Sequence, residues 1–342
     1  MQQVINHTKD RIEYIDTTKG ILIIFLIFHH VINVAKDIVS IDYLRYISKI
    51  DVLYVPYFMQ AFFLITGLCS NFNKPLRLFL LTNTKNLLIP LFSFAIINQF
   101  ITWSLLGHDF FFVQVLGVKF FFITELYWFL SALFIAKMML YAIRKFTSST
   151  KLQFILVLIP FLLATSLNNS SFHSYNFFHW HNAFSMLIFM WIGYVFKERD
   201  ILNVHGDKLW IPSLLFLIGI IFFILIEKQI PYYTHFPHYN WKYMLPFLFF
   251  ASTGSMMILY IGKKMPRIQK LIFLGQNTIV VYGIHFSLLL FVTLLLSKLF
   301  LPTNYVLGLI YYLIIGITVL FLSYLSCILF QNRYFNYLIG KF

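Results

Sequence analysis

Residues 19–30 read Lys-Gly-Ile-Leu-Ile-Ile-Phe-Leu-Ile-Phe-His-His, and this stretch decides the fold class. Its apolar run predicts a membrane-spanning helix over 20–36, with Lys19 at one end and two histidines near the middle. At about 1.5 Å per residue, His30 lies roughly 16 Å from Lys19, about half of a hydrocarbon core. Because an ionisable group inside a membrane is costly, it indicates a functional site by default.

The composition predicts an integral membrane protein. Hydrophobic residues make up 60% of the chain, aromatic residues 20% and charged residues only 11%, far from the balance of a soluble domain. We predict an all-α bundle of about ten transmembrane helices in a single polytopic domain, residues 1–342. The predicted spans are 20–36, 52–69, 87–106, 126–143, 152–168, 181–196, 209–226, 243–262, 276–297 and 305–330.

The net charge of +14 does not indicate nucleic-acid binding, because the basic residues form no block with interleaved aromatic residues. Most of the 26 lysines and arginines instead fall in alternate loops. The positive-inside rule therefore predicts that both the N-terminus and the C-terminus are cytoplasmic. No cleavable signal peptide is evident. The expected location of the protein is a bacterial inner membrane.

Two further features bear on function. Cys69 and Cys327 both fall in predicted spans and are interpreted as apolar packing residues, with no redox role. The predicted outside loop 167–181 lacks lysine and arginine but is rich in amides, hydroxyls and aromatic rings. Such a surface suits a neutral sugar, and it equally fits an aromatic belt at the membrane interface.

His30 is the candidate catalytic base, since an imidazole can take a proton from a hydroxyl and later return it. About 100° of helix rotation separates it from His29, so only one of the two is expected to face a cavity. Metal binding is the competing hypothesis. The predicted spans contain no ligand cluster, and His179 with His181 offers at most two ligands, so no metal is expected.

Several charged residues near the Lys19 end form a candidate anion site. Lys19, Lys85 and Arg77, with Lys74, are placed to bind the phosphates of a nucleotide-like donor. The alternative is ordinary anchoring to anionic lipid. Asp16, three residues before Lys19, is assigned with His30 to the catalytic residues, and it is expected to orient that lysine or to cap the helix.

A second group of polar residues falls at or inside other spans and is assigned to the substrate. Its members are Glu125, Trp128, Asn182, Asn277 and His285. Each fits equally well as an interfacial anchor or as a partner in an interhelical hydrogen bond.

The segment 14–30, with Asp16, Lys19-Gly20 and His30, resembles the opening signature of the membrane acyltransferase-3 family. Further segments resemble the family in the same order, over about residues 11–286. They are Phe62-Phe63-Leu-Ile-Thr-Gly67, Lys85-Asn-Leu-Leu-Ile-Pro90, Tyr127-Trp128-Phe129-Leu130, Trp191-Ile-Gly193-Tyr194, and Gly275-Gln-Asn277-Thr278 through His285.

The resemblance implies transfer of an acyl group, usually acetyl from cytoplasmic acetyl-CoA, to a hydroxyl of a surface polysaccharide or lipid-linked sugar in the cell envelope. It implies that His30 is the base, that Lys19 contacts the donor, and that Lys85 is one half of an Arg-x-x-Arg motif. The chain departs from the pattern at Thr82, where the other basic residue is missing, and at Asn182, where many relatives have an acid.

A transporter or flippase for an amphiphilic or glycolipid substrate is the alternative function. Ten spans with polar residues at the midplane would suit it, but the chain shows neither two similar halves nor matched broken helices. The sequence leaves open the acceptor, the acyl chain, direct transfer against an acyl-histidine intermediate, and the oligomeric state.

Overall fold

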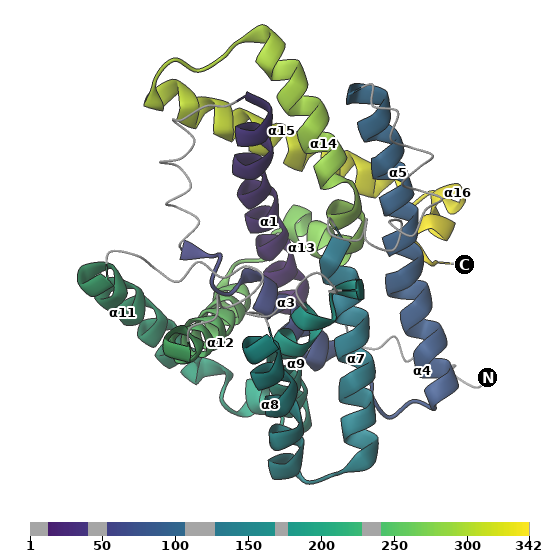
Figure 1. Ribbon diagram of the computed structural model, residues 1–342, viewed down its shortest axis with the longest axis vertical. Helices are drawn as coiled ribbons and strands as arrows, with labels where there is room; N and C mark the ends of the chain where they lie inside the picture. The colour runs from purple at the N-terminus through teal and green to yellow at the C-terminus, as the bar shows by residue number, and fades with distance from the viewer. Residues whose placement is uncertain (1–12, 40–52, 107–126, 168–176, 228–240, 342) are drawn as a thin grey trace, which may run out of the picture.

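The computed structural model describes residues 13–39, 53–106, 127–167, 177–227 and 241–341, and these are helical throughout apart from short turns (Figure 1). The longer helices are α1 (Glu13–Val39), α3 (Phe58–Cys69), α5 (Ile89–Leu106), α7 (Trp128–Phe146), α8 (Thr150–Leu167), α9 (Trp180–Glu198), α11 (Trp210–Glu227), α12 (Trp241–Lys264), α14 (Thr278–Leu299) and α15 (Tyr305–Leu329). The shorter ones are α4 (Leu76–Asn83), α10 (Ile201–Val204), α13 (Gln269–Gln276) and α16 (Arg333–Asn336).

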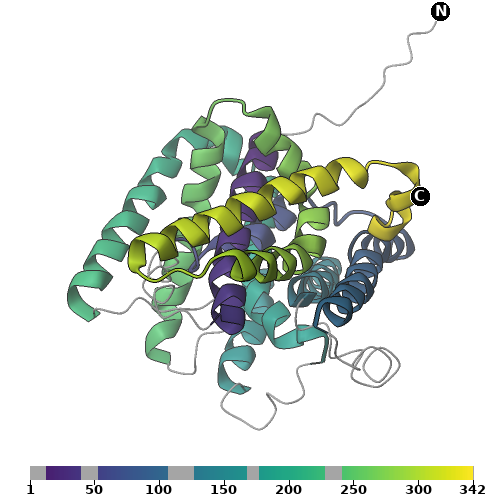
Figure 2. The same cartoon turned by 90° about the horizontal axis from the view of Figure 1, so that it is seen from above.

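Helix α1 lies in the middle of the bundle (Figure 2). It packs against α3, α12, α13, α14 and α15, and its apolar side chains such as Leu22, Ile27 and Val31 are fully buried. An apolar helix that is covered on nearly all sides belongs in the interior of a membrane bundle. The stretch 19–30, which predicts the fold class, therefore also lies at the centre of the helical bundle.

Each of the ten predicted spans overlaps a helix, although in the span 52–69 only Phe58–Cys69 is helical. Five helical stretches in the described residues are long and apolar enough to cross a membrane by length and composition: Glu13–Ala35, Leu76–Leu105, Met244–Lys264, Thr278–Leu299 and Tyr305–Leu329. The chain is thus an all-helical integral membrane protein. The number ten and the cytoplasmic position of both termini stay predictions.

Helix α1 begins earlier than the sequence predicts, at Glu13 and not near residue 20. Its first turns satisfy their own polar groups, because the hydroxyl of Thr17 donates to the Glu13 carbonyl at 3.1 Å and that of Thr18 to the Tyr14 carbonyl at 2.8 Å. Acidic residues in the first turn also complement the helix dipole. Lys19 consequently lies inside the helix, where its position is fixed.

Helices α1 and α13 dock backbone against backbone through two glycines. A Cβ at Gly20 of α1 would overlap the Leu271 carbonyl of α13, and one at Gly275 would overlap the Asp16 carbonyl. Small residues at such crossings let helices approach closely in a membrane. The short α13 is thereby held against the first turns of α1.

Helix α5 is continuous with α4 through a π-helical turn, Thr84–Leu88, which precedes Pro90. Proline has no N–H and its ring crowds the preceding turn, so a locally wider turn accommodates it. This turn carries Lys85, and its Leu87 side chain reaches the central cavity described below.

Candidate active site

Lys19 and Asp16 form an ion pair near the start of α1, with Lys19 Nζ 3.1 Å from Asp16 Oδ1. The Asp16 side chain is 3% exposed and that of Lys19 is 24% exposed. A buried carboxylate of this kind holds a lysine in one orientation. The expected contact between Asp16 and Lys19 is present, and a catalytic role for Asp16 stays a prediction.

Lys19 lines an outer cavity of about 280 Å³ together with residues of the segment that joins α3 to α4. Its polar lining also includes Lys74, Lys137, Asn71 and Thr82. Lysine ammonium groups with neighbouring amides and hydroxyls form a surface suited to phosphate oxygens. The outer cavity is therefore the candidate anion site.

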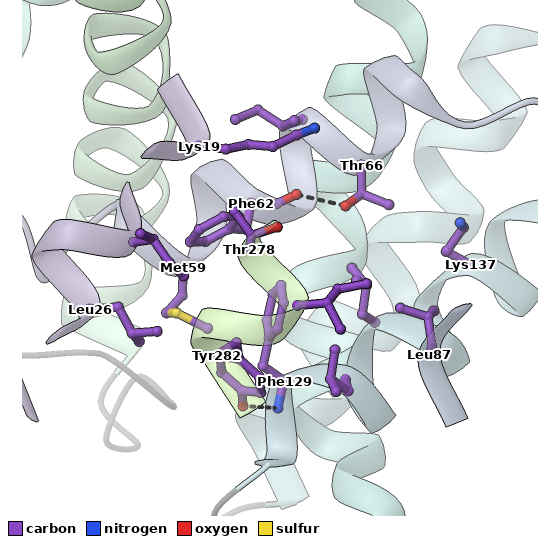
Figure 3. A pocket seen from close by; sticks show the side chains of 15 residues that line it. Lys19, Leu26, Met59, Phe62, Thr66, Leu87, Phe129, Lys137, Thr278 and Tyr282 are labelled. Carbon is purple, nitrogen blue, oxygen red and sulfur yellow. Dashed lines mark hydrogen bonds between the residues drawn. The ribbon is translucent and has the colours of Figure 1, made fainter. Parts of the chain in front are cut away.

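A second, inner cavity of about 190 Å³ lies between α1, α3, α7 and α14 (Figure 3). It shares Lys19, Ile65, Thr66 and Lys137 with the outer cavity, so the two cavities adjoin at a waist formed by these residues. Beyond the waist most of the lining is apolar. On α1 the lining runs Lys19, Ile23, Leu26; on α3 Thr66, Phe62, Met59; on α7 Lys137, Leu133, Phe129; and on α14 Thr278, Tyr282.

Lys137 is the residue of this site that the sequence assignments missed. It lies in α7, inside the predicted fourth span, and lines both cavities beside Lys19. A lysine within an apolar span is itself a signal of function. That signal was present in the sequence, but nothing there places Lys137 next to Lys19.

His30 lies one helical turn past Leu26, the last residue of α1 that lines the inner cavity. Its ring is 5.2 Å from the ring of His285 and 4.4 Å from that of Phe286, both on α14. His29 instead lies beside Phe58 of α3 and 3.4 Å from Asn33 Nδ2. The two neighbouring histidines thus face different helices, as their rotation predicts, and His30 is the one beside a second imidazole.

His285 is fully buried, and its Nδ1 is 2.7 Å from the Tyr282 carbonyl and 3.2 Å from the Val281 carbonyl. Because a carbonyl oxygen only accepts, Nδ1 carries the proton and donates it. Nε2 is then a bare acceptor, and it has no hydrogen-bond partner among the described residues. A buried acceptor without a hydrogen-bond partner costs free energy. A functional role beside His30 explains why this cost is tolerated.

The structure places Lys85 and Arg77 away from this path. Arg77 is exposed on α4, and Lys85 is partly exposed on the π-helical turn. Neither is among the residues that line the outer or the inner cavity. A donor role for either residue stays a prediction, and Lys74 and Lys137 are the cations that share the outer cavity with Lys19.

The residues assigned to the substrate are scattered. Trp128 is the first residue of α7 and is buried next to the cavity-lining Phe129. Asn182 is buried in the first turn of α9. Asn277 precedes α14, and its side-chain amide donates to the Phe273 carbonyl at 2.9 Å. None of the three lines either cavity. Of this group, the structure brings only His285 next to His30, and Glu125 lies outside the described residues.

Cys69 corrects one prediction. Its thiol was expected to pack inside a span, but Cys69 ends α3, is exposed and lines the outer cavity. The helix ends at this residue, so the side chain faces the cavity mouth. Cys327, by contrast, is fully buried in α15, as expected.

The comparison with known families agrees with this arrangement. The acyltransferase domain of the acyltransferase 3 family matches residues 12–328, nearly the whole chain. No curated protein and no solved structure matches the chain. The match implies an acyl donor and an acceptor, which makes acyl transfer, and not transport, the activity to be explained. The chain belongs to the acyltransferase 3 family and is a membrane-bound O-acyltransferase.

Proposed function

We propose that the protein transfers an acetyl group from cytoplasmic acetyl-CoA to a hydroxyl of a surface glycan or lipid-linked sugar, in a bacterial inner membrane. The observation that carries the proposal is the pair of adjoining cavities: the outer one has three lysines, and the largely apolar inner one ends at Leu26, one turn before His30. That order of charge and apolar lining matches a CoA thioester, which has phosphates at one end and a slender, uncharged arm at the other.

The separation between the inner cavity and His30 suits the chemistry. One helical turn, about 5.4 Å, lies between Leu26 and His30. An attacking hydroxyl needs about 3 Å to its base on one side and about 3 Å to the carbonyl carbon on the other. A thioester at the deep end of the inner cavity therefore lies about one helical turn from His30, a separation that one acceptor oxygen can bridge. His30 is partly exposed, and the acceptor is proposed to approach it from that side.

Label transfer tests the proposal directly. Purified protein is incubated with radiolabelled acetyl-CoA and a panel of surface glycans and lipid-linked sugars, and each acceptor is separated and counted. We expect label on a glycan hydroxyl, removable by mild base as an ester. Label on no acceptor in the panel, with no binding of acetyl-CoA, would reject the proposed donor.

We expect acetyl-CoA to protect Cys69 from alkylation. The thiol lines the outer cavity where the donor phosphates are proposed to bind, so a bound donor covers it. In maleimide labelling followed by mass spectrometry, the rate at Cys69 should fall about tenfold when acetyl-CoA is present at ten times its Kd.

The same chain supplies the control, because the buried Cys327 should stay unlabelled until the protein is denatured. S-acetylpantetheine lacks the nucleotide phosphates and should protect Cys69 much less at an equal concentration. An unchanged labelling rate at saturating acetyl-CoA would mean that the donor binds elsewhere.

Lys137→Met should raise the KM for acetyl-CoA with little change in kcat. Losing one charge-assisted hydrogen bond to a phosphate costs about 1.5–3 kcal/mol, roughly a tenfold or larger rise in KM. Lys19→Ala should act in the same direction, but it also removes an ion-pair partner of the buried Asp16, so Lys137→Met changes fewer interactions. Initial rates over a range of donor concentrations measure both constants.

Lys145→Met is the matched control, because Lys145 lies at the exposed end of the same helix and its ammonium is 5.6 Å from the Tyr141 ring. Its donor KM should equal that of the wild type. If Lys137→Met behaves like this control, Lys137 is not part of the donor site.

A further inference from the structure

We propose that Tyr282 is a catalytic residue, whose hydroxyl donates a hydrogen bond to the carbonyl oxygen of the thioester and stabilises the negative charge that develops there. The inference rests on the proposed function and adds a second chemical group to it. Acyl transfer needs a base for the acceptor and, separately, a donor for the oxyanion, and His30 supplies only the first.

The lining of the inner cavity singles out Tyr282. Five of its lining residues carry polar side chains, and three of these, Lys19, Thr66 and Lys137, belong to the waist shared with the outer cavity. Thr278 lies one turn before Tyr282 on α14, toward the waist. Among the described residues that line the deep end, Tyr282 is therefore the polar one, beside apolar Met59, Leu26 and Phe129 (Figure 3).

The environment of the phenol strengthens it as a donor. Its oxygen accepts a hydrogen bond of 3.4 Å from the backbone N–H of Phe129. That N–H belongs to the first turn of α7, where amides have no partner within the helix and the helix dipole is positive. An oxygen that accepts from such an amide releases electron density, which makes its own O–H a better donor.

Tyr282 also touches the histidine pair. Its ring is 5.7 Å from the ring of His285, which in turn is 5.2 Å from that of His30. The backbone carbonyl of Tyr282 accepts from His285 Nδ1, so the residue that orients this imidazole also lines the inner cavity. In the proposed complex the thioester carbonyl lies between the His30 imidazole and the Tyr282 hydroxyl.

The acceptor oxygen forms a bond to the carbonyl carbon while His30 takes the hydroxyl proton, and the Tyr282 O–H donates a hydrogen bond to the carbonyl oxygen without losing its proton. The carbon–sulfur bond then breaks, and the CoA thiolate takes the proton from the His30 imidazolium. The products are the acetyl ester and CoA with a free thiol.

Tyr282→Phe tests the proposal, because it removes only the hydroxyl and keeps the ring. Loss of one oxyanion donor typically lowers kcat about 10²–10³-fold. We expect a fall of that size with an unchanged KM for acetyl-CoA.

The matched control is Tyr127→Phe. It removes a shorter hydrogen bond, 2.7 Å, which the Tyr127 hydroxyl donates to the carbonyl of Gly283, the residue after Tyr282 in α14. Tyr127 does not line the inner cavity, so its loss should lower the thermal stability and leave kcat close to that of the wild type.

A spectroscopic measurement makes the test independent of turnover. In a His30→Ala background, the infrared C=O band of ¹³C-labelled acetyl-CoA should be shifted to lower frequency on binding, and Tyr282→Phe should return it toward the free value. A bound band that is equal in both backgrounds, or equal losses of kcat in the Tyr282 and Tyr127 variants, would overturn the inference. Failure of the donor to bind at all would instead count against the proposed function.

Discussion

His30→Ala should abolish measurable acetyl transfer while the protein still inserts and folds. General base catalysis by one side chain typically contributes about 10²–10⁴-fold, and an alanine at this position cannot take the acceptor proton. The packing cost should be modest, because His30 is only partly buried. Transfer of label from acetyl-CoA to the acceptor measures the loss, and size-exclusion chromatography in detergent verifies that the protein is folded.

His29→Ala is the matched control, since it removes an adjacent imidazole from the same helix. His29 faces Phe58 and Asn33, away from His285, and we expect its variant to keep most of the activity. Full activity in His30→Ala protein, or equal loss in both variants, would remove His30 from the mechanism.

The same protein distinguishes direct transfer from an acyl-histidine intermediate. When the wild type is incubated with labelled acetyl-CoA alone and quenched, direct transfer leaves the protein unlabelled. An intermediate instead places one acetyl group on it, which should disappear in His30→Ala.

Much of the fold could be predicted from composition and apolar runs, because each span must bury its own backbone polar groups as a helix. Apolar runs do not predict the helix ends, because the residues there are polar. Glu13, Thr17 and Thr18 look like a loop before the first span, yet they are helical, and the hydroxyls of Thr17 and Thr18 bond to carbonyls four residues back. The polar first turns of α1 are thus part of the helical bundle, and a search of the sequence for apolar segments does not detect them.

The candidate site could be predicted only along one helix at a time. Asp16, Lys19 and His30 share α1, so their spacing along that helix follows from sequence. Lys137 and Tyr282 join them from α7 and α14 through tertiary packing, whereas Lys85 and Arg77, which look like obvious partners, line neither cavity. The same packing selects His285, and not Asn182 or Asn277, as the neighbour of His30.

Gly193→Ala should destabilise the protein strongly, although alanine normally favours a helix by about 1 kcal/mol over glycine. The new methyl group would overlap the Leu64 carbonyl of α3, and Gly67 of α3 meets the Met190 carbonyl of α9 in the same way. Overpacking costs about 1–3 kcal/mol even where side chains can move, and here a helix backbone must move. We expect an apparent Tm in detergent lower by roughly 3–10 °C.

Gly219→Ala separates this effect from helix propensity, because it makes the same change in the interior of α11. Its methyl would meet ring atoms of Phe249 and Phe250, which can turn aside, and no backbone atom. Its Tm should stay equal or rise. Since α3 carries Met59, Phe62 and Thr66 of the inner cavity, separating α3 from α9 should also lower acetyl transfer. Equal Tm values for the two variants would show that the α3–α9 interface yields easily, and the cavity that depends on it would then not be rigidly preformed.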